Sequence, residues 1–450
     1  MNLPELNNCK IAIIGLGYVG LPLAHQFANQ NICCKSGKNL NREVIGFDIN
    51  VERINELKNG LDTTNEVSKK ELKKVSNLKL TSNPKDLENA EIFIITVPTP
   101  IDNLKQPDLS FLTKASELVG KVIKNKSSKS KKSKFTNPIV IYESTVYPGV
   151  TEDHCRPILD KESGLEFNKD YFLGYSPERI NPGDKQKKIT SIIKLTSGSN
   201  ELASNWIDQL YSSIIQAGTF KVKSIKIAEA AKVIENTQRD LNIALVNEFA
   251  IIFKLMNIDT LDVLEAANTK WNFLSFKPGL VGGHCIGVDP YYLTYKSEKL
   301  GYQPNVVLAG RQINNSMPAW IVKQIVEEMK KKNILDNKAK ALIFGITFKE
   351  NCSDIRNSKI FELITELENY SIECEITDPL VEEKNLLLKN NKYIKKNIDF
   401  TKNYEIMIFA VPHNQFLMFS KEEWDKLANN SKIIFDLKGI VPREHNPIRV

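Results

Sequence analysis

The segment from Phe276 to Asp289 holds the residue types best suited to covalent chemistry. It reads Phe-Lys-Pro-Gly-Leu-Val-Gly-Gly-His-Cys-Ile-Gly-Val-Asp, so Cys285 stands among four glycines. Glycine loses more chain entropy on ordering than other residues, and that cost is usual where backbone must approach a ligand closely. A thiol becomes a nucleophile when positive charge or amide donors favour its thiolate, and a helix starting after the loop would supply donors. A buried, inert thiol is the alternative that these residues leave open.

A second segment, Gly15-Leu-Gly-Tyr-Val-Gly20, has the pattern of a phosphate-binding loop, between a strand-like run and a helical one. Gly15 permits a tight turn, Gly17 lets the backbone approach a pyrophosphate, and Gly20 lets the helix pack on the sheet. The first amides of the helix and the positive end of its dipole then face the phosphates. The segment therefore predicts a dinucleotide site, against the alternative of a glycine turn without a ligand.

Asp48 ends the second strand-like run and is suited to bind a ribose. Its carboxylate would accept hydrogen bonds from both ribose hydroxyls and repel a 2′-phosphate, which favours NAD over NADP. Asp48 lies 28 residues after Gly20, where about 20 is usual, and an insertion at residues 31–41 accounts for the excess. Arg53 is left open between a contact with the adenosine and an exposed position on a helix.

These candidate residues lie in a chain that alternates strand-like and helical stretches, as a doubly wound parallel sheet requires. A helical pattern without Gly or Pro fills residues 224–257, long enough to join two domains and offer a dimer surface. We expect helices at residues 19–30 and 358–369, and strands at residues 10–14, 43–48, 90–97, 137–142, 340–345, 373–378, 405–411 and 432–436.

The expected fold class is α/β, with two Rossmann-like doubly wound parallel-sheet domains joined by a central helical domain with a long connecting helix. We expect the N-terminal domain at residues 1–222, the central helical domain at 223–325 and the C-terminal domain at 326–450. Residues 31–41 are expected to form a surface insertion, and the Lys/Ser-rich stretch 124–136 a solvated loop.

Composition excludes several other classes of protein. The 450 residues are 42% hydrophobic and 26% charged, as in soluble globular proteins, and no apolar run is long enough to span a membrane. The N-terminus lacks a secretory pattern, so we expect a cytoplasmic protein without a membrane partner. Seven cysteines and five histidines show neither disulfide nor metal-ligand spacing. The net charge of +7 fits an anionic small substrate better than a nucleic acid, because no nucleic-acid-reading motif accompanies it.

The chain resembles the UDP-glucose/UDP-N-acetylhexosamine 6-dehydrogenase family, which oxidises UDP-sugars to uronic acids with NAD. This resemblance implies a homodimer in which the N-terminal domain binds NAD, the central domain carries dimerisation and catalysis, and the C-terminal domain binds the UDP-sugar. The motifs that carry it are Gly15-Leu-Gly-Tyr-Val-Gly20, Val97-Pro-Thr-Pro, Ser144-Thr-Val, Ser176-Pro-Glu-Arg, Lys232-Val-Ile-Glu-Asn236, Gly282-Gly-His-Cys285 and Phe348-Lys-Glu-Asn.

The same resemblance implies a reaction in two oxidations. Cys285 would attack the aldehyde formed by the first oxidation, giving a thiohemiacetal, and the second oxidation would give a thioester that water hydrolyses. Lys232 and Asn236 would stabilise the oxyanion, although their helical spacing alone also fits a polar helix face. The implied catalytic residues are Cys285, Lys232, Asn236, Asp289, Glu178 and Thr145, with Asp289 and Glu178 acting on the water and Thr145 holding the water or nicotinamide region.

The resemblance also implies two sets of binding residues. The cofactor set is Gly15, Gly17, Tyr18, Val19, Gly20, Asp48, Arg53, Thr99, Thr145 and Arg356. The substrate set is Glu178, Arg179, Lys232, Asn236, Arg239, Gly282, Phe348 and Lys349. Arg356 would close the cofactor site from the third domain, with an ion pair at a domain interface as its alternative role.

Two stretches, at residues 229–242 and 271–285, resemble the branch that acts on UDP-N-acetylhexosamines. The likeness, of which His284 is part, is greatest to enzymes using UDP-N-acetylglucosamine or UDP-N-acetylgalactosamine and suggests a role in surface polysaccharide precursor synthesis. UDP-glucose and UDP-N-acetylmannosamine are alternative substrates. The rival functions are a single-step dehydrogenase of the 6-phosphogluconate type, a non-catalytic NAD-binding redox sensor and a scaffold for a polysaccharide complex.

Overall fold

The protein divides into two compact units, seen here in a computed structural model that describes residues 2–129, 136–180, 189–283, 285–334, 339–381 and 394–450. The first unit comprises Met1–Glu235 with Tyr291–Leu300, and the second comprises Asn236–Pro290 with Gly301–Val450. Two helices, α7 (Ile225–Leu255) and α9 (Asp289–Lys299), contribute residues to both units. The expected three-domain boundaries at 222 and 325 stay predictions.

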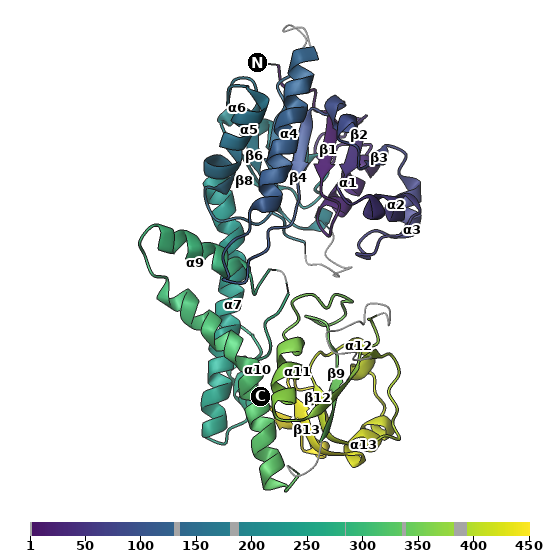
Figure 1. The fold of residues 1–450 in the computed structure, drawn as a ribbon, viewed down its shortest axis with the longest axis vertical. Helices are drawn as coiled ribbons and strands as arrows, with labels where there is room; N and C mark the ends of the chain where they lie inside the picture. Colours follow the sequence, from purple (N-terminus) through teal and green to yellow (C-terminus); the bar gives the residue numbers. More distant parts are fainter. Residues whose placement is uncertain (1, 130–135, 181–188, 284, 335–338, 382–393) are drawn as a thin grey trace. The chain divides into compact units, whose positions relative to one another are not determined.

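The first unit is built on an eight-stranded sheet with the order β3-β2-β1-β4-β5-β6-β7-β8 (Figure 1). All neighbouring strands pair in parallel except β6 and β7. The strands are β1 (Lys10–Ile14), β2 (Glu43–Phe47), β3 (Leu78–Thr81), β4 (Ile92–Ile95), β5 (Ile139–Tyr142), β6 (Phe172–Tyr175), β7 (Lys194–Gly198) and β8 (Thr219–Lys221).

Helices bury both faces of this sheet. Along β1, Ile11 and Ile13 belong to one hydrophobic core, while Ala12 and Ile14 belong to another, because successive side chains of a strand point to opposite faces. The first core contains residues of α1 (Gly20–Asn29) and α6 (Glu201–Ser212), and the second contains residues of α4 (Ser110–Lys129) and α5 (Arg156–Ser163). The unit also contains α2 (Val51–Lys58), α3 (Lys69–Lys74) and a π-helical turn at Val150–Cys155.

The second unit is built on a six-stranded parallel sheet with the order β11-β10-β9-β12-β13-β14. The strands are β9 (Lys340–Phe344), β10 (Glu373–Thr377), β11 (Ile394–Lys395), β12 (Tyr404–Phe409), β13 (Ser431–Asp436) and β14 (Ile448–Arg449). The other helices are α8 (Thr260–Ala267), α10 (Asn305–Lys331), α11 (Ile360–Asn369), α12 (Asn414–Leu417) and α13 (Lys421–Asn429).

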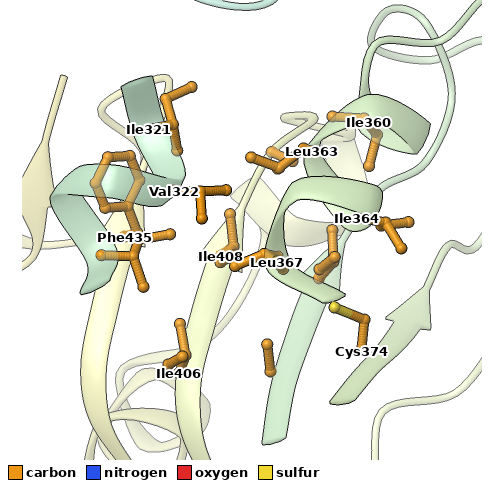
Figure 2. Packing of buried hydrophobic residues seen from close by; sticks show 14 of the residues in the cluster. Ile321, Val322, Ile360, Leu363, Ile364, Leu367, Cys374, Ile406, Ile408 and Phe435 are labelled. Carbon is orange, nitrogen blue, oxygen red and sulfur yellow. The ribbon is translucent and has the colours of Figure 1, made fainter. Parts of the chain in front are cut away.

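Two cores also cover the faces of the second sheet. On one face, α10 and α11 pack on β12, and Figure 2 shows Val322 and Leu367 close to Ile408. On the other face, Phe344 and Phe409 stack with ring centroids 4.1 Å apart, next to Trp424 of α13. The expected fold class is therefore confirmed: two doubly wound sheets accompany a helical middle.

The expected helices and strands are present, with ends that differ by one to a few residues, and α7 covers Ile225–Leu255 within the expected 224–257. The expectation of a loop at 124–136 was wrong for its start, because α4 continues to Lys129; residues 130–135 lie outside the described structure. Residues 31–41 are mostly exposed, as expected. Within the described residues, no helix combines the length and apolarity needed to cross a membrane.

Candidate active site

The glycine loop of the first unit joins β1 to α1, as the sequence predicts. Gly15 has a φ of +98°, and its amide donates to the Phe47 carbonyl at 2.8 Å. A Cβ at Gly20 would lie 1.8 Å from the Gly15 carbonyl oxygen, so only glycine permits this contact. Gly17, in contrast, has no atom within 4 Å of the position of a Cβ and faces open space. No described side chain caps the start of α1, which suits its amides to an anion such as a pyrophosphate.

Asp48 follows β2 and is half-buried beside the glycine loop. Its Oδ2 accepts a hydrogen bond from the Leu16 amide at 2.8 Å, and its Oδ1 accepts one from the Asn50 amide at 2.9 Å. Each carboxylate oxygen can accept more than one hydrogen bond, so the group keeps acceptor capacity for ribose hydroxyls. These residues fit the adenosine half of NAD, and contacts of Tyr18 and Val19 with the cofactor stay predictions.

Arg53 is not the exposed helix residue that one alternative expected. It is buried, and it donates to the Leu16 carbonyl at 3.1 Å, to Thr63 Oγ1 at 3.0 Å and to Asp62 Oδ1 at 2.6 Å. Its guanidinium thus fixes the glycine loop to the segment after α2. A direct contact with the adenosine stays a prediction.

Thr99 and Thr145 lie together after two neighbouring parallel strands, β4 and β5. Thr99 Oγ1 donates to the Thr145 carbonyl at 2.7 Å, and both residues are half-buried. Ligands of open α/β sheets bind beyond the carboxyl ends of the strands, which is where this pair stands. The pair therefore fits the nicotinamide region of the predicted cofactor site.

Glu178 follows β6 and is 8% exposed. Its Oε1 accepts from the Ile180 amide, while its Oε2 has no hydrogen-bond partner among the described residues. A buried carboxylate oxygen without a partner is costly, and such groups are frequent at functional sites. Arg179 pairs with Glu235 of α7 and donates to the Ile193 carbonyl at 2.9 Å. Binding of substrate phosphate by Arg179 would thus compete with an existing ion pair.

A buried polar cluster that was not predicted from the sequence adjoins the segment that carries Glu178. Lys194 is buried and donates to Glu143 Oε2 at 2.6 Å and to the Pro177 carbonyl at 3.1 Å. Tyr211 donates to the other Glu143 oxygen, and burial raises the pKa of Glu143. The only sequence signal is a lysine at the start of an otherwise apolar strand, β7.

The predicted residues of α7 differ in exposure. Lys232 is buried, Asn236 is half-buried and Arg239 is exposed, although the three lie three or four residues apart. A solvated polar helix face would expose all three, so the burial of Lys232 argues against that alternative. Burial of a lysine is unusual unless its charge is used or paired.

The Cys285 loop lies in the second unit and leads into α9. Cys285 is half-buried, and its carbonyl accepts from the Asp289 amide at 2.8 Å, so the expected helix start follows directly. Asp289 is buried, and its Oδ2 accepts from Asn236 Nδ2 at 2.5 Å. The structure therefore brings together two of the predicted catalytic residues. His284 lies outside the described residues.

Two glycines of this loop contact protein rather than open space. A Cβ at Gly282 would lie 2.6 Å from the Asn357 carbonyl oxygen, and a Cβ at Gly283 would lie 2.7 Å from the Phe348 ring. Their lack of a side chain thus serves packing within the protein, and substrate binding by Gly282 stays a prediction. Phe348 is thereby placed against the segment that carries Cys285, and Lys349 follows it.

Arg356 pairs with Asp354 of its own unit through Nε at 3.0 Å and Nη2 at 2.8 Å. Its guanidinium is about half-exposed, and closure of the NAD site by Arg356 stays a prediction. Lys438, which follows β13, was missed. It donates to the Pro278 carbonyl at 3.2 Å, and burial lowers its pKa. The charge of Lys277 lowers the pKa of Lys438 further, and Lys349 Nζ lies 5.6 Å from the centroid of the Phe348 ring.

Comparison with protein-family models gives three matches in chain order. The models are described as the NAD binding domain, the central domain and the UDP binding domain of the UDP-glucose/GDP-mannose dehydrogenase family, and they match residues 9–215, 226–316 and 342–443, respectively.

Similar proteins and structures cover nearly the whole chain. A UDP-N-acetyl-D-glucosamine 6-dehydrogenase of Pseudomonas aeruginosa is 50% identical and is aligned over 99% of this chain and 100% of its own. A UDP-N-acetyl-D-mannosamine dehydrogenase of Methanocaldococcus jannaschii is 32% identical over 97% and 93%. The solved structure of a UDP-D-ManNAc dehydrogenase from Pyrococcus horikoshii superposes with a TM-score of 0.83 at 29% identity, covering 98% and 97%.

Gly17 and Gly20 provide a matched pair for testing the cofactor site. Gly20→Ala should destabilise the protein by about 1–3 kcal/mol, because its methyl group would overlap the Gly15 carbonyl. Gly17→Ala should leave stability nearly unchanged and weaken NAD binding by about tenfold or more, because the added methyl group would occupy the space predicted for the pyrophosphate. Thermal unfolding and calorimetric NAD titration measure the two effects. Unchanged NAD affinity in Gly17→Ala would contradict the assignment.

Glu229 of α7 makes stability depend on pH. Its carboxylate accepts from the Gly149 amide at 2.5 Å and the Thr151 amide at 2.9 Å, yet burial raises its pKa from 4.5 to about 7. The native state then holds a proton that the unfolded chain releases, so this contribution is complete below pH 4.5 and lost as pH rises through 7.

We expect Glu229 to account for a decline of about 3 kcal/mol in unfolding free energy across that window. Glu229→Gln should flatten the decline, whereas Glu298→Gln, at an exposed position of α9, should keep it. Urea unfolding at several pH values measures both. Equal pH dependence in the wild type and in Glu229→Gln would refute the assignment.

Proposed function

Because the chain belongs to the UDP-glucose/GDP-mannose dehydrogenase family, we propose that this NAD-dependent oxidoreductase converts the C6 hydroxymethyl group of a UDP-N-acetylhexosamine to a carboxylate. The preferred substrates are UDP-N-acetylglucosamine and UDP-N-acetylgalactosamine. The relative named for the first of these is 50% identical, against 32% for a relative named for UDP-N-acetylmannosamine. UDP-N-acetylmannosamine and UDP-glucose are the alternatives.

The observation that carries this proposal is the environment of Cys285. The half-buried thiol precedes α9, and the buried Asp289 at the start of this helix is hydrogen-bonded to the half-buried Asn236 of α7. The Phe348 ring, within the part of the chain that matches a UDP binding domain, packs on the Cys285 loop. The segment that carries the thiol thus contacts a polar pair that reaches α7 and an aromatic ring from the loop after β9.

The proposed reaction consists of two oxidations with a covalent intermediate on Cys285. In the first oxidation, the C6 alcohol loses the proton of its hydroxyl group and a hydride from C6 to give the aldehyde, and NAD would serve as the hydride acceptor in both oxidations. The Cys285 thiolate then adds to the aldehyde carbon, and the oxyanion takes up a proton to give the thiohemiacetal. Oxidation of that adduct gives a thioester. Water attacks the thioester carbon, the C–S bond breaks, and the products are the carboxylate and the free thiol.

The proposed roles of the other residues follow from their charge and burial. Lys232 is a buried cation suited to stabilise the oxyanion, and the Asn236 amide shares that role. Glu178 has a buried carboxylate oxygen without a described partner, as a general base awaiting water would have. Asp289 holds Asn236 in place through their hydrogen bond and orients the water.

The proposed substrate site uses cations and an aromatic ring. Arg179, Arg239 and Lys349 offer positive charge to the diphosphate, and Lys438 is added to them because it stands beside Pro278. Gly282 belongs to the Cys285 loop, and Phe348 packs on the next residue of that loop, Gly283. A cytoplasmic location and a role in making precursors of surface polysaccharide belong to this proposal.

The number of NADH molecules formed per sugar tests the proposed function. Protein and NAD are incubated with limiting amounts of UDP-N-acetylglucosamine, UDP-N-acetylgalactosamine, UDP-N-acetylmannosamine or UDP-glucose in separate reactions. We expect two NADH per sugar with one or both of the first two. One NADH per sugar would favour the single-step rival, and binding of NAD without turnover of any sugar would favour the redox sensor.

A trapped intermediate tests the covalent step. Glu178→Gln should lower turnover by about 10²–10⁴-fold, because hydrolysis loses its base, and a sugar thioester should accumulate. Intact-mass measurement should show this adduct on Glu178→Gln and not on the double variant that also carries Cys285→Ala. If Glu178→Gln turned over slowly, formed two NADH per sugar and showed no adduct, the proposed covalent role of Cys285 would be wrong.

We propose that the enzyme is a homodimer that forms through α7. Leu245, Ile252 and Leu255 lie seven and three residues apart on this helix and are 48%, 43% and 82% exposed, and Trp271 after α8 is 91% exposed. Exposed apolar side chains at helical spacing mark association surfaces. They favour pairing of two copies along this helix.

Light scattering coupled to size exclusion tests the dimer. The double variant Leu245→Glu with Ile252→Glu should elute as a monomer, since charge would be buried at the interface. Lys254→Glu, an exposed position on the other side of α7, should remain dimeric. A wild-type protein that is monomeric at micromolar concentration would refute the proposal.

A further inference from the structure

His413 is a buried histidine that the reaction above does not use. It follows β12 and precedes α12, and both His413 and Asp378, the residue after β10, are fully buried. Nε2 of His413 lies 3.1 Å from Asp378 Oδ2 and 3.2 Å from Thr347 Oγ1. Nδ1 accepts a hydrogen bond from the Asn351 amide at 3.0 Å. Because Nδ1 is an acceptor, the ring proton is on Nε2 and faces the carboxylate.

The Asn351 amide belongs to the segment Thr347–Asn351, here called the Phe348 loop. Thr347 Oγ1 donates to the Lys349 carbonyl at 2.9 Å, and Asn351 ends the loop with a φ of +56°. The Asn351 side chain donates to Asn414 Oδ1 at 3.0 Å and accepts from the Asn414 amide at 2.9 Å. His413 and its neighbour Asn414 therefore hold the end of the loop through three hydrogen bonds.

The other side of the Phe348 loop meets the Cys285 segment. The Phe348 ring lies where a side chain on Gly283 would stand, and Gly283 is two residues before Cys285. The Gly283 amide also donates to the Asn357 carbonyl at 3.0 Å, which ties the two segments together. A displaced Phe348 loop would alter both the predicted substrate residues and the packing beside the thiol.

Asp378 is the counterpart of Asp48 in the second sheet. Asp48 Oδ2 accepts from the Leu16 amide at 2.8 Å, and Asp378 Oδ2 accepts from the Ile346 amide at 2.8 Å. Gly345 has a φ of +88°, close to the +98° of Gly15. The two carboxylates differ in access, because Asp48 is half-buried whereas Asp378 is fully buried against His413.

We propose that His413 is a positioning residue for substrate binding: Asp378 fixes the imidazole as its Nε2–H tautomer, and Nδ1 then holds the Phe348 loop for the nucleotide sugar. This inference rests on the proposed function, since it names Phe348 and Lys349 as substrate contacts. It also gives Asp378 a purpose other than binding a ribose. In the first sheet, the Asp48 carboxylate is predicted to bind the nucleotide, whereas in the second sheet the equivalent Asp378 carboxylate orients a histidine.

Two substitutions separate the two nitrogen atoms of His413. The Oδ1 atom of asparagine stands near the position of Nδ1, so His413→Asn keeps an acceptor for the Asn351 amide. The Nε2 atom of glutamine stands near the position of the ring Nε2, so His413→Gln keeps a donor for Asp378 and loses the acceptor. A purely structural role predicts no such order between the variants.

We expect His413→Gln to raise the KM for the UDP-sugar by about three- to tenfold, as loss of one buried hydrogen bond would. His413→Asn should raise it less than about twofold, and the KM for NAD should not change in either variant. Hydrogen exchange without substrate should be faster for the peptide that contains the Phe348 loop in His413→Gln alone. If His413→Gln does not fold, Asn414→Ala, at an exposed position, replaces it. It removes the Asn414 Oδ1 acceptor of the Asn351 side chain and should likewise raise the KM for the UDP-sugar.

Different outcomes separate this inference from the proposed function. Equal increases of the UDP-sugar KM in the two His413 variants, or parallel increases of the NAD KM, would overturn the positioning role while leaving the function in place. A wild-type protein that neither binds nor oxidises any UDP-sugar would overturn the proposed function and this inference together.

Discussion

A backbone amide bound to a carboxylate at the end of a strand organises both sheets of this protein. In the first sheet, the turn after β1 places the Leu16 amide on Asp48, and in the second, the turn after β9 places the Ile346 amide on Asp378. Each bond joins two neighbouring parallel strands at their carboxyl ends, where ligands of such sheets bind. The glycine turns after β1 and β9 and the Phe348 loop all lie at these two carboxyl ends.

Close packing of glycines sets the second constraint. Gly20 permits α1 to touch the glycine loop, and Gly283 permits the Phe348 ring to touch the Cys285 segment. In both places a methyl group would push apart two segments that must meet. The chain therefore accepts the entropic cost of ordering glycine in order to bring a binding surface against a reactive or charged group.

Much of the fold was predictable from local patterns. Strands such as Lys10–Ile14 are mostly apolar runs, and the 31 residues of α7 lack glycine and proline. The local sequence is therefore enough to predict these elements. The glycine loop and Asp48 were predictable for the same reason, because a short motif and one strand end define them. The start of α9 after Cys285 also followed from the sequence.

The remaining parts of the site depend on contacts between distant residues. Lys194 supports Glu178 by pairing with Glu143, 51 residues away, and His413 meets Asp378, 35 residues away. Arg53 is a typical surface residue by pattern, and only the folded loop around Leu16 buries it. No periodicity encodes such pairings, since each depends on which strands become neighbours in the sheet.

The closure of Asp378 by His413 has a consequence for the order of events in the proposed reaction. Because His413 occupies the Asp378 carboxylate, Asp378 is not available to a ribose in the way proposed for Asp48, and the proposed reaction would use one dinucleotide at a time. Two oxidations then require the spent cofactor to leave and a fresh one to enter while the half-oxidised sugar stays behind. A covalent bond to Cys285 would keep the sugar in the site during this exchange, because the reactive aldehyde could not diffuse away before the second oxidation.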